Sequence, residues 1–290
     1  MKRGYVDTSK GQLHYYETGS GETILLIHQV ARSGQSYARL AGFLAPHYRV
    51  ISMDMPGFGN SDPLPAGFEM ADLVQATVEL LDGLGIDKVR VSGHHTGATL
   101  AVELAVSHPE RVTALAPTGF FYLTKEEQKD FADMEHLKGR HKTPVIDELS
   151  SDGSHLTRFF QRAISLLWQS KQSLGAKGNL MLPLEDLSLE ELTFVNDFIM
   201  DGLKAYPYSR TTHDAVARYD NDARLPLLKV PTLIIQSSGP LEPAVFQRVD
   251  MVQKLVPGSH TATIENGYIH MPYSRAEELS KILLEFFRYK

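Results

Sequence analysis

A turn of sequence Gly-His-His-Thr-Gly, centred on His95, joins a predicted strand over residues 88–92 to a predicted helix over 98–107. A sharp strand-to-helix turn needs small residues two positions before and after its apex, because the apex backbone is strained and larger neighbours would clash. Gly93 and Gly97 have this spacing about His95. Strand, turn and helix in succession are typical of a βα crossover, so the segment predicts a parallel α/β sheet.

The alternation of strand and helix signals continues on both sides of this turn. Short apolar or alternating runs predict strands at residues 3–8, 12–17, 23–27, 48–53, 88–92, 112–116, 231–236 and 262–265. Apolar residues at helical spacing predict helices over 35–44, 70–84, 98–107, 244–255 and 274–287. The first two strands are joined by a short Ser-Lys-Gly turn and predict an antiparallel hairpin. Unbroken apolar runs such as residues 23–27 are typical of parallel strands covered on both faces.

Between residues 119 and 225 the strand signals disappear. Amphipathic segments replace them, over residues 124–138, 155–169, 187–204 and 209–219. We interpret residues 119–225 as a helical cap inserted after the sixth strand, and residues 1–118 and 226–290 as the core. The predicted fold class is an α/β fold whose mostly parallel eight-stranded sheet is flanked by helices and carries one helical cap.

Composition narrows the classes of partner. The net charge of −6 and the pI near 6.1 give no electrostatic basis for binding nucleic acid or an anionic membrane, which attract basic surfaces. The chain has no cysteine, which excludes disulfides, thiolate nucleophiles and cysteine metal ligands. Residues 1–10 lack the apolar run of a signal peptide, and no stretch reaches the length of a membrane span, about 18 apolar residues. We expect a cytoplasmic protein that acts on a small-molecule substrate; its oligomeric state, a homodimer included, is left open.

The turn around His95 resembles the G-x-S-x-G nucleophile elbow of the α/β-hydrolases, with histidine in place of serine. Residues 54–61, Asp-Met-Pro-Gly-Phe-Gly-Asn-Ser, look very like the D-x-P-G-x-G-x-S loop of the same family. His270 lies between the last predicted strand and the last predicted helix, where the family places its catalytic histidine. On these motifs the chain is identified as an atypical member of the α/β-hydrolase fold superfamily, of the cap-domain type.

The resemblance also implies an oxyanion hole. His28 and Gln29, after the third predicted strand, are similar to the His-Gly turn whose following residue offers an oxyanion-hole amide, with Gln29 in place of glycine. On the family pattern, the amides of Val30 and Thr96 would stabilise a developing oxyanion.

The acid of the expected triad is displaced. In the family it stands a few residues beyond the seventh strand, where this chain has Gly239 and Pro240. Glu242 is the nearby carboxylate, and whether it reaches His270 is left open. Because both the nucleophile and the acid are changed, a Ser-His-Asp mechanism is not assumed.

A histidine at the apex has several chemical uses. The first turn of the following helix points amides at it and adds partial positive charge, which disfavours the imidazolium form. A neutral His95 can act as a general base, as a nucleophile that forms an acyl-imidazole, or as a metal ligand. We expect His270 to contact His95 across the pocket, so that at most one of the two is protonated at neutral pH and they form an acid–base pair.

The substrate-binding candidates are His28, Gln29, Arg32, His94 and Trp168. His28 and His94 could join His95 and His270 in a metal site, but a structural role for His28 and His94 is favoured. No metal or other cofactor is expected. Arg32 would pair bidentately with a substrate carboxylate at the pocket mouth, and a solvated arginine on a loop is the favoured alternative. Trp168, the only tryptophan, is expected to pack within the cap rather than stack on a substrate.

Three functions follow from these residues. The first is a hydrolase that cleaves an ester, an amide or an activated C–C bond of a small organic substrate, through water activated by His95 or attack by His95 itself. The second is a lyase, isomerase or oxygenase without a cofactor, in which His95 and His270 transfer protons. The third is a pocket that binds a small molecule without catalysis, since two triad positions are lost. We favour the hydrolase, because histidine is more reactive than an inert replacement such as alanine.

Overall fold

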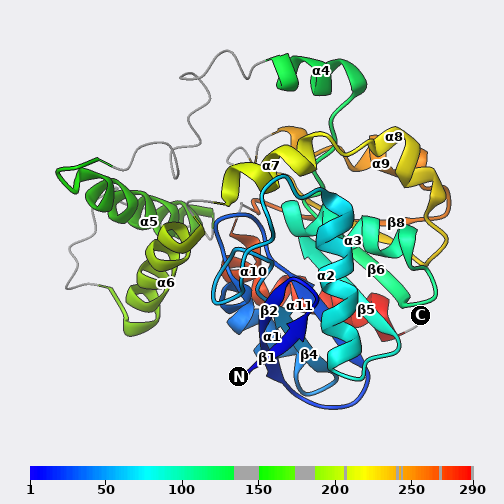
Figure 1. Ribbon diagram of the computed structural model, residues 1–290, viewed down its shortest axis with the longest axis horizontal. Helices are drawn as coiled ribbons and strands as arrows, with labels where there is room; N and C mark the ends of the chain where they lie inside the picture. The colour runs from blue at the N-terminus through cyan, green and yellow to red at the C-terminus, as the bar shows by residue number, and fades with distance from the viewer. Residues whose placement is uncertain are drawn as a thin grey trace.

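The computed structural model describes residues 1–133, 150–173, 187–205, 208–239, 242, 244–267 and 270–288. Within these residues an eight-stranded sheet runs through the molecule (Figure 1). Its strands are β1 (Lys2–Thr8), β2 (Gly11–Thr18), β3 (Thr23–Ile27), β4 (Arg49–Met53), β5 (Val89–His94), β6 (Val112–Thr118), β7 (Leu233–Ser237) and β8 (His260–Ile264). They lie in the spatial order β1-β2-β4-β3-β5-β6-β7-β8.

The sheet is antiparallel at one edge and parallel elsewhere. β1 pairs with β2, and β2 pairs with β4, in antiparallel register, whereas the strand pairs from β4 to β8 are parallel. The central strands β3 and β5 are buried along their whole length. Because the carboxyl ends of parallel strands share one edge of the sheet, the loops that follow β3, β5 and β7 lie close together there.

Helices cover both faces of this sheet. The described helices are η1 (Gly34–Tyr37), α1 (Ala38–Leu44), α2 (Met70–Gly83), α3 (Thr96–Ser107), α4 (Lys125–Asp133), α5 (Ser154–Ser173), α6 (Leu189–Ala205), α7 (Ser209–Ala217), α8 (Asn221–Arg224), η4 (Leu225–Leu227), η5 (Ala244–Phe246), α9 (Val249–Leu255), α10 (Met271–Ser274) and α11 (Ala276–Arg288). On one face α2, α3 and α9 share an apolar cluster that includes Leu73, Leu100 and Val252. On the other face α1 and α11 pack through Leu40 and Leu283. The predicted fold class is confirmed.

Between β6 and β7 the described elements are helices. α5 and α6 pack on each other through a separate apolar cluster that includes Leu166 and Val195, and they project to one side of the sheet (left in Figure 1). Val216 of α7 and Ala205 at the end of α6 instead join the apolar cluster on the sheet. The division into a core and a cap at residues 119–225 stays a prediction. The part of the predicted helix 124–138 beyond Asp133 lies outside the described residues.

The observed elements differ from the predicted ones mainly at their ends. The predicted helices over 35–44 and 244–255 each divide into a 3₁₀ segment and an α-helix. The predicted helix over 274–287 is present as α11, and the short helix α10 precedes it. β7 begins at Leu233 rather than at Pro231, whose nitrogen has no hydrogen to donate to a sheet. None of the helices in the described ranges is long and apolar enough to cross a membrane.

Candidate active site

His95 sits at the apex of the turn between β5 and α3, with φ 48° and ψ −112°. Such a backbone is strained for a residue with a side chain, and it persists only where the surroundings hold it. A Cβ atom on Gly93 would lie 2.1 Å from the Gly97 carbonyl oxygen, and one on Gly97 would lie 2.1 Å from the Ile27 carbonyl oxygen. The two glycines therefore let the turn pack against itself and against the end of β3.

Glu242, from the loop after β7, is the hydrogen-bond partner of His95. The distance from His95 Nε2 to Glu242 Oε1 is 2.6 Å, and the two side chains are only 5% and 1% exposed. The sequence left open whether Glu242 reaches His270, and the structure places it against His95 instead. The residue at the family's nucleophile position is thus paired directly with a carboxylate that stands a few residues beyond the family's acid position.

Aromatic rings cover both faces of the His95 imidazole. The His94 ring stacks on it with centroids 4.2 Å apart, and the Phe246 ring lies parallel to it with centroids 3.8 Å apart. Gly119, at φ +56°, leaves room beside the ring, because a Cβ atom there would lie 2.6 Å from His95 Cδ2. The imidazole is therefore held in one orientation.

Burial determines the protonation of this pair. Burial lowers the pKa of His95 to about 3, and His213 lowers it by a smaller amount. Burial also raises the pKa of Glu242 to about 7, and the electrostatic effect of His94 opposes this rise. His95 is therefore neutral at neutral pH, while Glu242 gains or loses its proton near pH 7.

The state of Glu242 sets the tautomer of His95. An ionised Glu242 accepts the hydrogen bond from Nε2–H and leaves the lone pair on Nδ1, whereas a protonated Glu242 donates to Nε2 and leaves the hydrogen on Nδ1. Among the residues that the structure describes, none is hydrogen-bonded to His95 Nδ1. With Glu242 ionised, Nδ1 can therefore accept a proton.

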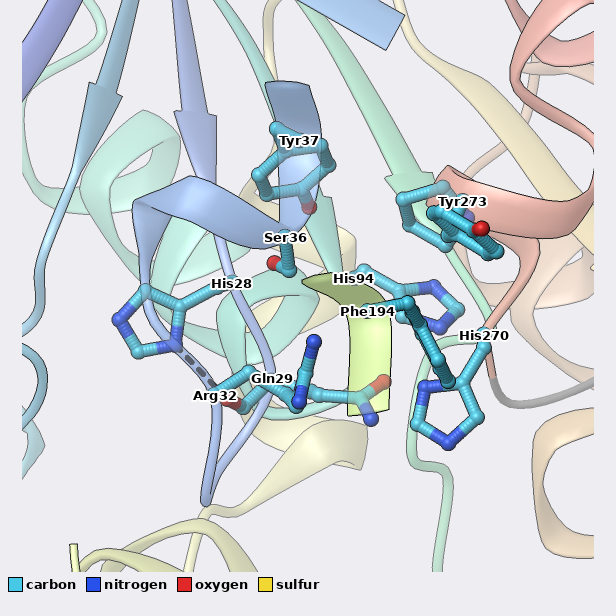
Figure 2. Close-up of a pocket in the computed structure, with 10 residues that line it drawn as sticks. His28, Gln29, Arg32, Ser36, Tyr37, His94, Phe194, His270 and Tyr273 are labelled. Carbon is cyan, nitrogen blue, oxygen red and sulfur yellow. Dashed lines mark hydrogen bonds between the residues drawn. The ribbon is translucent and has the colours of Figure 1, made fainter. Parts of the chain in front are cut away.

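A pocket of about 270 Å³, its open mouth included, is lined by His94, the neighbour of His95 in the chain (Figure 2). The residues that line it are His28, Gln29, Arg32, Ser36, Tyr37, His94, Phe194, His270, Pro272 and Tyr273. His94 and His270 thus share this pocket, whereas His95 is not among its lining residues. The acid–base pair expected of His95 and His270 stays a prediction.

His270 lies among cations, imidazoles and aromatic rings. Burial lowers its pKa well below the usual range, and Arg32, His94 and His95 add to this shift. The Phe194 ring meets it edge-on, with centroids 5.7 Å apart. At neutral pH the His270 ring is therefore uncharged and has one donor and one acceptor nitrogen.

Arg32 is buried, and the expectation of a solvated arginine is wrong. Only 3% of the residue is exposed, because α6 covers it. Its guanidinium carbon lies 5.5 Å from the centre of the Phe194 ring and 5.0 Å from that of Phe198. Arg32 Nη1 lies 3.7 Å from Oδ2 of Asp201 on the same helix. Sequence reasoning missed these α6 residues, although two phenylalanines four positions apart indicate one helix face.

Both ring nitrogens of His28 are engaged. Nε2 accepts a hydrogen bond from the Met55 amide at 2.9 Å, so Nδ1 carries the hydrogen and donates to the Gln29 carbonyl oxygen at 2.7 Å. Burial lowers the pKa of His28 to about 4, which agrees with a neutral ring. The ring therefore holds the loop after β3 against the loop after β4, while part of the residue lines the pocket.

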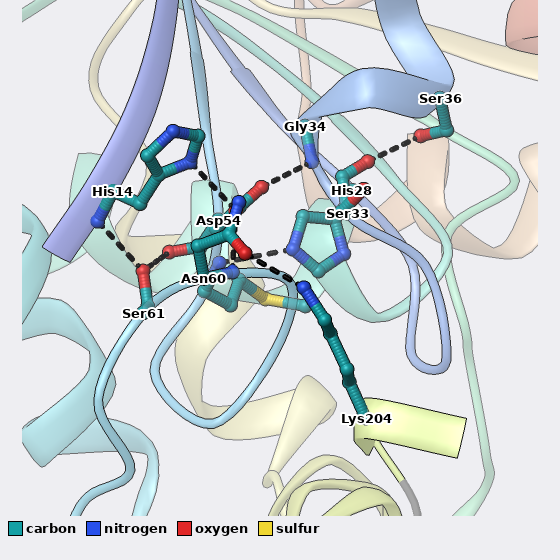
Figure 3. Close-up of polar contacts among 10 residues, drawn as sticks. His14, His28, Ser33, Gly34, Ser36, Asp54, Asn60, Ser61 and Lys204 are labelled. Atoms are coloured by element: carbon teal, nitrogen blue, oxygen red, sulfur yellow. Dashed lines mark hydrogen bonds and ion pairs between the residues drawn. The ribbon is translucent and has the colours of Figure 1, made fainter. Parts of the chain in front are cut away.

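Asp54 forms hydrogen bonds that connect the segment after β3 with the loop after β4 (Figure 3). Its carboxylate accepts hydrogen bonds from the amides of Gly34 at 2.7 Å and Asn60 at 2.9 Å, and it pairs with His14 Nδ1 at 2.8 Å. Lys204 of α6 donates to Asn60 Oδ1 at 2.7 Å. These contacts connect the segment after β3, the loop after β4 and α6.

The remaining candidates lie around the turn and in α5. Thr96 is the first residue of α3, so its amide has no acceptor within the helix. Val30 follows β3, next to Ala31, whose φ is 60°. An oxyanion hole formed by the Val30 and Thr96 amides stays a prediction.

Trp168 is buried in α5 and does not line the pocket. In the described part of the chain, no group of three or more histidine, aspartate and glutamate residues is arranged to hold a metal ion.

Known proteins resemble this chain in sequence and in fold. The (E)-2-((N-methylformamido)methylene)succinate hydrolase of Acinetobacter baylyi is 34% identical over 103 residues, which are 36% of this chain and 39% of that protein. The 2-hydroxy-6-oxononadienedioate/2-hydroxy-6-oxononatrienedioate hydrolase 1 of Dechloromonas aromatica is 31% identical over 184 residues, 56% of this chain and 61% of that protein. The chain thus spans less than two thirds of the length of these curated relatives.

A solved structure extends the likeness to the whole chain. The enol-lactonase from Burkholderia xenovorans matches with a TM-score of 0.71 at 17% sequence identity, and the match covers 98% of this chain and 100% of that one. At this identity the likeness concerns the fold alone. A family model described as the alpha/beta hydrolase fold matches residues 22–271, which is most of the chain. This protein therefore belongs to the α/β-hydrolase fold family.

Proposed function

We propose that the protein hydrolyses a small organic substrate. In this proposal His95 is the general base that activates water, and Glu242 orients the His95 ring. The observation that carries this proposal is the 2.6 Å hydrogen bond between His95 Nε2 and Glu242 Oε1. A carboxylate bonded to one nitrogen of a histidine holds the tautomer and stabilises the imidazolium that forms when the other nitrogen takes a proton. The pair therefore supplies a base without a serine.

The packing of His95 favours general base catalysis over covalent attack. The rings of His94 and Phe246 cover its two faces at 4.2 and 3.8 Å, and Nδ1 is the ring nitrogen nearer the main chain. An acyl group on Nδ1 would need space beside this stack, whereas a water molecule needs far less. Nδ1 would take a proton from water as the oxygen adds to the substrate carbonyl, and the same proton would then pass to the leaving group.

Further residues of the candidate site would support this reaction. The amides of Val30 and Thr96 would stabilise the oxyanion that forms on the carbonyl. His270, a neutral ring that lines the pocket, would exchange a hydrogen bond with the substrate. Phe194 and Tyr273 give the pocket an aromatic wall for the carbon skeleton.

The relatives support hydrolysis of a small organic molecule. The two curated relatives are named as hydrolases, one of a methylene-succinate derivative and one of nonadienedioate and nonatrienedioate derivatives. Their matches to this chain cover only part of each protein, so the reaction is proposed for this chain and not transferred to it.

Kinetics of His95→Asn, Glu242→Gln and His47→Asn test the proposal with a panel of aryl esters, lactones and vinylogous diketones. We expect turnover of at least one substrate class, with a loss of about 10²-fold or more in the His95 variant and a substantial loss in the Glu242 variant. His47 is exposed, and its variant is the matched control for loss of a histidine. Wild-type rates in the folded His95 variant would overturn the role of His95. Ligand binding without turnover, unchanged in that variant, would indicate a binding protein.

Proton transfer without hydrolysis is a second candidate, because two further imidazoles, His94 and His270, line the pocket. A lyase or an isomerase needs one group to remove a proton and another to return it. Deuterium uptake from solvent into recovered, unhydrolysed substrate, lost in His270→Asn, would identify this chemistry.

A further inference from the structure

Arg32 is a buried arginine in the wall of the pocket. It is 3% exposed, and Figure 2 shows its side chain and that of Gln29 between His28 and His270. The loop after β3 carries Arg32, and α6 covers it. Burying a guanidinium is unfavourable unless its N–H groups find acceptors and its charge finds a counter-ion.

Two nitrogens of the Arg32 side chain form no hydrogen bond within the described residues. Its Nε and Nη1 are buried there without an acceptor. Asp201 Oδ2 lies 3.7 Å from Nη1, beyond hydrogen-bond distance, and has no donor among the same residues. An arginine–carboxylate pair that only links two elements closes to about 2.7–2.9 Å. The open spacing therefore leaves both charged groups able to bond a further molecule.

Two aromatic rings hold the guanidinium without accepting its N–H groups. Its carbon lies 5.5 Å from the Phe194 centroid and 5.0 Å from the Phe198 centroid. Aromatic faces stabilise a cation through the ring quadrupole. The charge is thus stabilised and positioned while its donors stay available for a ligand.

We propose that Arg32 binds a carboxylate of the substrate, and that this carboxylate replaces Asp201 as the counter-ion of Arg32. A guanidinium matches a planar carboxylate through two parallel hydrogen bonds. A dianion such as phosphate would meet stronger repulsion from Asp201 and Asp197 of α6, so a single carboxylate is the better fit. The substrate class is a small organic acid. That class rests on the proposed hydrolysis at His95, whereas binding of the carboxylate does not require turnover.

Replacement of the counter-ion has a consequence for Asp201. The charged and titratable groups that act on it are Arg32, Asp54, Asp197 and Tyr16. Burial raises the pKa of Asp201 to about 6, and Arg32 opposes this effect. When a ligand carboxylate takes over Arg32, Asp201 loses its counter-ion and gains a negative neighbour, so its pKa rises further. Binding near pH 7 should therefore be accompanied by proton uptake.

Isothermal titration calorimetry with propionate, and with propionamide as its uncharged isostere, tests the site directly. We expect propionamide to bind at least about tenfold more weakly than propionate in the wild type, and Arg32→Met to remove this preference. Asp201→Asn should tighten propionate binding, because the competing carboxylate is gone. Titrations at pH 7 in buffers of different ionisation enthalpy should show proton uptake in the wild type and none in Asp201→Asn.

Lys204→Met is the matched control for loss of a cation near α6 and should bind propionate as the wild type does. If Arg32→Met does not fold, Arg32→Lys carries the same test, since lysine keeps the charge without the planar fork and should bind propionate more weakly. Equal binding of propionate and propionamide, full propionate binding in a folded Arg32 variant, or no gain in Asp201→Asn would each overturn the proposal. If the wild-type protein hydrolyses none of the test substrates but binds propionate, and His95→Asn binds it equally well, the proposed hydrolysis fails and the carboxylate site stands.

Discussion

The Phe246 ring lies parallel to the His95 ring, with centroids 3.8 Å apart and an interplanar angle of 4°. His94 covers the opposite face, and Glu242 holds Nε2 through a 2.6 Å hydrogen bond. The stack prevents the imidazole from tilting, and the hydrogen bond prevents its rotation within the ring plane. Nδ1 is therefore kept in one position, as a catalytic base requires.

Phe246→Ala should loosen this arrangement. We expect kcat to fall about tenfold or more, because small displacements of a reacting group have large kinetic effects. The pKa of His95 should rise, because its ring becomes more hydrated. Steady-state kinetics and NMR titration of the His95 ring measure the two effects. Phe43→Ala, at an exposed position on α1, is the control. An unchanged kcat and an unchanged His95 pKa would show that Phe246 does not hold the base.

Hydrolysis should increase with pH through about 7. The base needs a lone pair on His95 Nδ1, which requires an ionised Glu242, and burial holds the pKa of Glu242 at about 7. Below that pH the protonated carboxyl donates to Nε2 and the hydrogen is on Nδ1, so kcat should fall about tenfold per pH unit. Glu242→Gln should remove this pH dependence from the residual activity. If kcat of Glu242→Gln still fell below about pH 7, the pH dependence would come from the titration of another group.

Local rules made the turn and the sheet predictable. The spacing of Gly93 and Gly97 follows from steric contacts within a few residues, so the apex at His95 could be inferred without a structure. Unbroken apolar runs such as residues 23–27 identify strands covered on both faces. Helix ends were less predictable, because 3₁₀ segments such as η1 depend on packing against other parts of the chain.

Long-range contacts account for what the sequence did not reveal. Glu242 and His95 are 147 positions apart, and their contact depends on the conformation of the loop after β7. The burial of Arg32 depends on α6, whose Phe194 and Phe198 lie far along the chain. The spacing of these phenylalanines indicates a helix face but not which residue that face covers.

Gly119→Ala should damage the site more than backbone strain alone explains. A Cβ atom at Gly119 would lie 2.6 Å from His95 Cδ2, and the φ of +56° is unfavourable for alanine. Gly85 has a similar φ of +64° with nothing within 4 Å of its Cβ position, so Gly85→Ala measures the strain alone. We expect both variants to lose roughly 1 kcal/mol or more in urea unfolding. Only Gly119→Ala should also lose kcat, by about tenfold or more. Equal kinetics in the two variants would show that the imidazole can move aside without effect.

Asp54→Asn should destabilise the fold strongly. The Asp54 carboxylate has no exposed surface, and its two oxygens serve three donors, the amides of Gly34 and Asn60 and Nδ1 of His14. Asparagine replaces one oxygen with an NH₂ group that faces a donor, so at least one buried N–H loses its acceptor. We expect the free energy of unfolding in urea to fall by roughly 3 kcal/mol.

The exposed Asp62 offers a matched control for this change. It accepts a hydrogen bond from the Gln12 amide at 2.9 Å, so Asp62→Asn removes the same charge at a position open to water. Water can replace a lost acceptor there, and the expected change is below about 1 kcal/mol. A loss in Asp54→Asn no larger than in Asp62→Asn would mean that the loops after β3 and β4 are held together by other contacts, such as the 2.9 Å hydrogen bond from the Met55 amide to His28.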